Sequence, residues 1–150
     1  EVVADYGHVG LTLRAHPVSF LRESLTRRRY LSCAAATRLK DRQRVETAGI
    51  VLVRQQPGSA KGVIFVTIED ETGIANLVVW RKVFLAFRPI VMGAPMIGMK
   101  GYVQREGEVV HLVVQHLTDL SADFSTIARR GGEAEAGETR SIRVISRDFH

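Results

Sequence analysis

Five short apolar segments between residues 45 and 120, each rich in β-branched side chains, most constrain how this chain can fold. Within them apolar and polar residues alternate with a period of two, which is typical of β-strands that bury one face. Glycine-containing turns separate several of the segments. Strands are predicted over residues 45–53, 63–69, 74–80, 95–105 and 108–117, and a helical spacing predicts a helix over 81–91.

The order of these elements, three strands, one helix and two strands, is typical of the OB-fold, a small Greek-key barrel. Gly49 and Gly101 fall inside predicted strands, where glycine commonly marks the sharp bend that such a barrel needs. We therefore expect a mainly β protein. Its core would be a five-stranded OB-fold Greek-key barrel with one helix between strands three and four, preceded by a short helical basic segment.

Composition divides the 150 residues into three parts. Residues 1–44 are predicted to be a basic, partly helical connecting segment, with a helix from Pro17 because proline is favoured in a first helical turn. Residues 45–120 form the predicted barrel. Residues 121–150 are predicted to be a linker and C-terminal tail, because the Gly and Glu residues of 131–138 are too polar to build a core.

The net charge of +5 comes from 21 Lys and Arg against 16 Asp and Glu, and suggests an anionic partner such as nucleic acid. The whole excess lies in residues 1–44, so it does not by itself indicate that the barrel binds nucleic acid. The run Arg27 to Arg29 has two interpretations. It is either a solvated helix end, where the helix dipole favours cations, or a patch that contacts phosphates.

No residue constellation indicates catalysis, a metal or a cofactor in this chain. His111 and His116 are an odd number of residues apart, so on one strand they should face opposite ways and share no metal. The acidic run Glu69 to Glu71 matches a tight turn better than a pair of metal-binding carboxylates. The single cysteine, Cys33, fits a reducing compartment. No segment has the roughly 20 apolar residues of a membrane span, so we expect a cytoplasmic protein.

A binding groove is better supported, because OB-folds bind oligonucleotides on their second and third strands and on the loops beside them. Alternation places Ile64 and Ala75 with the core and leaves Phe65 and Asn76 on the opposite face. Phe65 either stacks on a base or packs under a loop. For Trp80, packing beneath the helix is the favoured interpretation. The candidate nucleic-acid-binding residues are Arg54, Lys61, Phe65, Thr67, Asn76 and Arg105.

Four stretches carry a more specific resemblance: DYGHVGLTLRAHPVSFLR, VETAGIVLVRQQPGSAKGVIFVTIEDETGIANLVVW, GYVQREGEVVHLVV and SIRVISRDFH. They resemble the C-terminal part of bacterial error-prone DNA polymerases, which are C-family enzymes related to the DNA polymerase III alpha subunit. The resemblance implies that the catalytic palm lies upstream of the matched segment. The whole enzyme would be a DNA-directed DNA polymerase acting in translesion synthesis.

By this resemblance the chain is a non-catalytic module that binds single-stranded DNA. The barrel is also similar to anticodon-binding OB-folds of some aminoacyl-tRNA synthetases, whose base-contacting aromatic and amide match Phe65 and Asn76 in position. The alternative is a protein-docking module. Its partners would be the sliding clamp or the Y-family-like protein that accompanies these polymerases.

Overall fold

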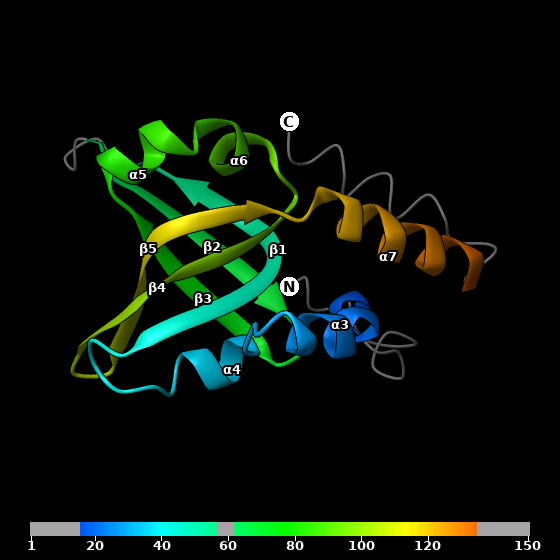
Figure 1. Ribbon diagram of the computed structural model, residues 1–150, viewed down its shortest axis with the longest axis horizontal. Coiled ribbons are helices and arrows are strands. Elements are labelled where there is room, and N and C mark those ends of the chain that lie inside the picture. Colours follow the sequence, from blue (N-terminus) through cyan, green and yellow to red (C-terminus); the bar gives the residue numbers. More distant parts are fainter. Residues whose placement is uncertain (1–15, 57–61, 135–150) are drawn as a thin grey trace.

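The computed structural model describes residues 16–56 and 62–134, with side chains as far as residue 129. Within these ranges the strands form a closed barrel in the order β1, β2, β3, β5, β4 (Figure 1). The strands are β1 Arg44–Gln55, β2 Ile64–Asp70, β3 Gly73–Val79, β4 Met96–Glu106 and β5 Val109–Asp119. Neighbouring strands are antiparallel except β3 and β5, which are parallel. The predicted five-stranded barrel is confirmed.

Two glycines let the barrel close. β1 pairs with β4 over residues 44–50 and with β2 over residues 50–55, so it changes partner where Gly49 lies. A Cβ at Gly49 would lie 2.8 Å from the carbonyl oxygen of Glu69, and one at Gly101 would collide with the carbonyl oxygen of Val113. Next to Gly101 the β4–β5 pairing skips Gln115, which forms a bulge. Both predicted bends therefore coincide with close backbone contacts.

The predicted alternation of buried and outward residues holds along β2 and along β3 as far as Leu77, whereas Val78, which was predicted opposite the core, is buried. Ile64, Val66 and Ile68 of β2 are buried, as are Ala75 and Leu77 of β3. They fill the barrel interior together with apolar residues of the other three strands. The alternating positions on β2 therefore lie on the outer surface.

The segment between β3 and β4 is helical, as predicted, but it forms two short helices, α5 Arg81–Ala86 and α6 Arg88–Gly93. The helix breaks at Phe87, which has φ −122° and ψ 27°. Pro89 explains the break, because proline has no amide proton for the carbonyl of Leu85 and its ring would clash with that carbonyl. The two helices cover one end of the barrel (Figure 1).

The N-terminal segment is helical, as predicted, in the short elements η1 Pro17–Leu21, α3 Arg22–Arg27 and α4 Cys33–Ala36. After β5 the structure differs from the predicted linker, because α7 extends over Ser121–Ala134. Its Phe124 and Ile127 pack in a second apolar cluster with residues of η1 and α3. The polar composition of 131–138 concealed this helix, whereas Leu120, Phe124 and Ile127 are spaced as one face of a helix.

Across residues 16–56 and 62–134, none of the helices combines the length and apolar character that crossing a membrane requires.

Candidate nucleic-acid interface

The outer surface of β2 and β3 brings four side chains together, and we call Phe65, Thr67, Asn76 and Trp80 the β2–β3 face. Thr67 of β2 is the cross-strand partner of Asn76 of β3. Two residues away on each strand, Phe65 is the partner of Val78. Trp80 follows the last residue of β3, and the extended backbone there keeps it on the side of Asn76. The face thus carries polar and aromatic side chains on two adjacent strands, with the buried Val78 between Asn76 and Trp80.

The polar pair on this face is oriented by a hydrogen bond. The Thr67 hydroxyl donates to Oδ1 of Asn76 over 3.0 Å. Because this bond occupies the carbonyl of the amide, the NH2 group of Asn76 is directed away from Thr67 as a donor. An amide held in this way suits the acceptor atoms on the edge of a base. The structure therefore brings two of the predicted site residues into one small unit.

Phe65 packs against a residue of β5 instead of under a loop. Its ring is half-buried and lies 6.0 Å from the His111 ring of β5, at an interplanar angle of 52°. One side of the phenyl ring is thus held by the barrel, and part of it stays accessible. A ring fixed in this way can stack on a base with little loss of side-chain entropy.

Trp80 was predicted to pack beneath the helix, and this prediction was wrong. The side chain is 52% exposed. The reason is that Trp80 caps the start of α5, and α5 runs over the end of the barrel instead of over its outer surface. Strand alternation placed Trp80 on the same side as Asn76, opposite the core, and this was the sequence signal for its outward side chain, although Val78 between them is buried.

Two exposed cations, Arg81 and Lys82, follow Trp80 directly. Arg81 also adjoins the β1–β2 loop, since a Cβ added at Gly62 would lie 2.8 Å from the Cβ of Arg81. These two residues were not among the predicted site residues, and they belong to a predicted helix. Lys61, the predicted cation of that loop, lies outside the described residues.

Arg54 and Arg105 are placed away from this face by their hydrogen bonds. Arg54 donates to the carbonyls of Val91 and Ala94 over 2.5 and 2.6 Å, and burial lowers the pKa of its guanidinium. Arg105 donates to the carbonyls of Thr37 and Leu39 over 2.8 and 2.9 Å. Both guanidinium groups therefore bind the backbone at the ends of short helices, which is a structural role.

The acidic run after β2 forms the predicted turn and also holds the N-terminal segment. Oδ1 of Asp70 accepts from the amide and the hydroxyl of Thr72, both over 2.7 Å. Oδ2 accepts from Arg22 over 2.9 Å and from the amide of Cys33 over 2.8 Å. Arg22 also makes two hydrogen bonds to Glu71, of 2.7 and 2.9 Å. The carboxylates of Asp70 and Glu71 thus accept hydrogen bonds from other groups of the protein.

The prediction that His111 and His116 face opposite ways was wrong. The bulge at Gln115 adds one residue between His111 and His116, so both lie on the outer side of β5 despite their odd spacing. Their rings nonetheless contact different aromatic residues, Phe65 for His111 and Phe87 for His116. Over the described ranges no cluster of three potential metal ligands exists.

The residues that form the barrel match a known protein family. The sequence model of a family described as an OB-fold nucleic acid binding domain matches residues 45–120. The chain belongs to this OB-fold family. Among solved structures, the asparaginyl-tRNA synthetase of Pyrococcus horikoshii aligns with 61% of this chain and 23% of its own, with a TM-score of 0.52 and 22% identity. That likeness shows that the OB-fold domain has the expected fold.

The OB-fold domain and its flanking segments also match error-prone DNA polymerases, as the sequence motifs predicted. Error-prone DNA polymerase 1 of Agrobacterium fabrum is 51% identical over 180 residues, which cover 100% of this chain and 16% of that polymerase. Error-prone DNA polymerase 2 of Rhizobium meliloti is 60% identical over 132 residues, covering 88% and 12%. The chain therefore spans a small part of the polymerases it matches.

Proposed function

We propose that this OB-fold domain binds single-stranded DNA as part of an error-prone DNA polymerase, through the β2–β3 face. The observation that carries the proposal is the half-exposed Trp80 at the end of β3, the strand that carries Asn76 of the Thr67–Asn76 pair, on the strands that OB-folds use for oligonucleotides. DNA synthesis would be the work of other parts of such a polymerase, acting in the cytoplasm where its DNA lies.

Each side chain of the face has a distinct task in this proposal. Trp80 and Phe65 offer ring faces on which successive bases stack, a contact worth about 1 to 3 kcal/mol for each base. The NH2 group of Asn76 donates to a base edge, while Thr67 fixes its direction. Arg81 and Lys82 supply the positive charge that attracts the phosphate backbone.

A titration of the 150-residue chain with a fluorescent single-stranded oligonucleotide tests the proposal. We expect salt-sensitive binding that weakens about fivefold or more for Trp80→Ala and for Phe65→Ala, because each removes a stacking platform. Asn76→Ala should weaken binding less, since it removes one hydrogen bond. Leu85→Ala is the matched control, because Leu85 is 55% exposed on α5 and lies off the β2–β3 face. Absence of binding at low salt, or equal losses in all four variants, would contradict the proposal.

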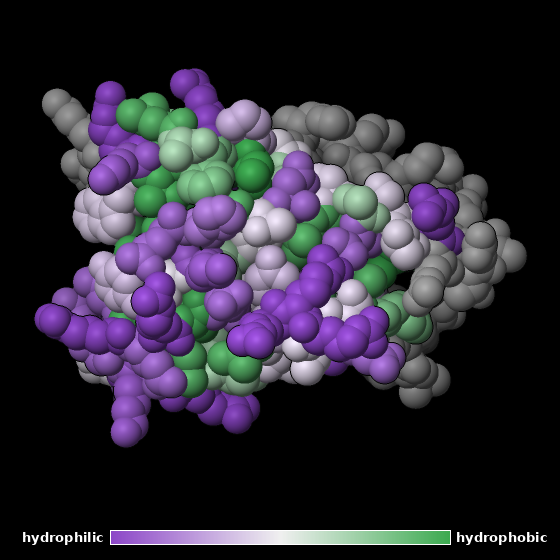
Figure 2. Space-filling model, viewed as in Figure 1, coloured by the Kyte–Doolittle hydropathy of each residue, from purple (hydrophilic) through white to green (hydrophobic). Residues whose placement is uncertain are grey.

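A protein-docking role is the alternative, and one feature favours it. Figure 2 shows hydrophobic side chains gathered over α5 and α6, where Leu85 and Met92 are 55% and 51% exposed. If this patch binds the sliding clamp or a Y-family-like partner, Leu85→Ser with Met92→Ser should abolish capture of that partner. The same double variant should leave oligonucleotide binding unchanged.

A further inference from the structure

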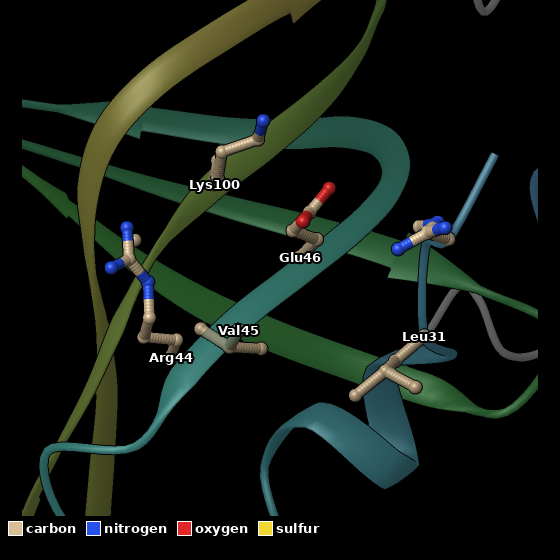
Figure 3. A pocket seen from close by; sticks show the side chains of 7 residues that line it. Leu31, Arg44, Val45, Glu46 and Lys100 are labelled. Carbon is tan, nitrogen blue, oxygen red and sulfur yellow. The ribbon is translucent and has the colours of Figure 1, made fainter.

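A hollow lined by basic residues lies on β1 and β4. It has a volume of about 370 Å³, and its charged lining residues are Arg29, Arg44, Glu46 and Lys100. We call it the basic hollow. Figure 3 shows Arg44, Glu46 and Lys100 extending from the neighbouring strands, with Leu31 across from them. In the barrel order, β4 is the strand opposite the junction of β2 and β3, so the hollow is separate from the β2–β3 face.

The three cations of the hollow make no ion pair with the described chain, although Glu46 lies opposite Lys100 across β1 and β4. Within residues 16–56 and 62–129, no ion pair of 4 Å or less involves Arg29, Arg44 or Lys100. Arg22 and Arg28, by contrast, pair with acidic residues of other elements. Glu46 is the single acidic residue of the lining, so positive charge is in excess there.

Arg29 also occupies a backbone position that favours glycine. Its φ is 74°, directly after α3. Its amide donates to the carbonyl of Thr26 over 2.9 Å. The amide of Tyr30 donates to the carbonyl of Leu25 over 2.9 Å. These are the two hydrogen bonds of a Schellman motif, whose left-handed residue is usually glycine because a Cβ is crowded there. This motif fixes the backbone at Arg29, next to the other cations that line the hollow.

The chemistry of the lining selects one kind of ligand. Three cationic side chains with few competing acids attract a polyanion, and guanidinium groups suit phosphate oxygens. No aromatic side chain lines the hollow, so it offers nothing on which a base could stack. We propose that the basic hollow binds the phosphodiester backbone of DNA at a second site, away from the β2–β3 face. This proposal extends the proposed function, and different variants test the two.

The test compares two triple variants of the 150-residue chain by DNA titration at several salt concentrations. Arg29→Gly with Arg44→Gln and Lys100→Gln removes the three cations, and glycine at position 29 suits the left-handed backbone. The control removes equal charge from exposed residues outside the hollow, through Arg38→Gln, Lys40→Gln and Arg88→Gln. Denaturant unfolding of each variant checks that it is folded.

We expect the hollow variant to lose about tenfold or more in affinity at low salt. The slope of log affinity against log salt should become shallower by about 2 to 3, as three lost phosphate contacts imply. Separate titrations with single-stranded and duplex oligonucleotides show which backbone the hollow holds, and a loss on either supports the proposal. Equal losses in the hollow and control variants, or no loss on either DNA, would overturn it.

Two single variants complete the design. Glu46→Gln should strengthen binding about twofold or more, because it removes the carboxylate that repels phosphate, and weaker binding would contradict the proposal. Trp80→Ala should lower affinity without changing the salt slope. If only Trp80→Ala has an effect, the basic hollow fails and the β2–β3 face stands. If only the hollow variant has an effect, the basic hollow stands and the β2–β3 face fails.

Discussion

Asp70 shows how one side chain joins three parts of the molecule. Its carboxylate is fully buried and accepts hydrogen bonds from the turn after β2, from α3 and from the start of α4. Burial alone would raise its pKa, but the bonds from Thr72 and Cys33 and the charge of Arg22 together lower it below its ordinary value of 3.8. The hydrogen bond from Arg22 likewise lowers the pKa of Glu71.

These lowered pKa values predict how stability depends on pH. The unfolded chain binds protons at a higher pH than the folded one, so the stabilisation is complete above about pH 5 and is lost as the pH falls through about 4 and below. Asp70→Asn should cost about 2 to 3 kcal/mol at pH 7, because it weakens a buried ion pair. It should also flatten the acid branch of a plot of unfolding free energy against pH. An unchanged acid branch in the variant would contradict this account of Asp70.

Arg42 provides a stability test at a second left-handed position. Its φ is 72°, in a turn closed by the bond from the Gln43 amide to the Lys40 carbonyl over 3.0 Å. Arg42→Gly should stabilise the fold by up to about 1 kcal/mol, because relief of the left-handed conformation exceeds the added entropy of the unfolded chain. Urea unfolding measures the difference. Arg38→Gly is the control and should give no gain, since the backbone of Arg38 is not left-handed.

At the scale of elements, the strands were predictable because they are rich in β-branched residues and are separated by turns. Strict alternation of buried and outward residues holds along β2, whereas the other strands each bury three or more consecutive residues. The helix break at Phe87 and the helix α7 were not predicted. Pro89 was assigned to the end of one helix, and a polar segment concealed the apolar spacing ahead of it. Both features depend on how these helices pack on the rest of the protein. The spacing of apolar residues within one segment does not contain that information.

The packing of α7 gives a prediction at this scale. Ile127 is 2% exposed and lies in the second apolar cluster with Val18 and Leu25. Ile127→Ala should therefore destabilise the protein by about 2 to 4 kcal/mol, as a cavity left by a buried isoleucine does. Ser125→Ala, on the exposed side of the same helix, should change stability by less than about 0.5 kcal/mol. Equal, small effects in thermal or urea unfolding would show that α7 does not contribute to the fold.

The candidate site was partly predictable from the sequence, for a physical reason. Phe65, Thr67 and Asn76 follow from strand alternation, which is a local property of β2 and β3. The positions of the Arg54 and Arg105 side chains could not be predicted in this way. Only the folded chain shows which backbone carbonyls lie within reach of their guanidinium groups. The exposure of Trp80 depended on the direction in which α5 leaves the barrel.

For the whole molecule, the net charge of +5 has a narrower meaning than its size suggests. Several N-terminal arginines are used within the fold, as Arg22 is with Asp70 and Glu71 and Arg28 with Asp123. Other cations remain exposed, and the two proposed DNA contacts use those next to Trp80 and those of the basic hollow. Charge distribution, more than total charge, therefore connects this structure with nucleic-acid binding.

The fluorescence of Trp80 tests the central claim most directly, because Trp80 is the single tryptophan of the chain. Titration with a single-stranded thymidine oligonucleotide should quench its emission to saturation, since a base stacks on the indole ring, and added salt should reverse the effect. Anisotropy of a label on the same oligonucleotide reports binding independently. Binding by anisotropy with unchanged Trp80 emission, or no binding at low salt, would contradict the claim that the β2–β3 face holds single-stranded DNA.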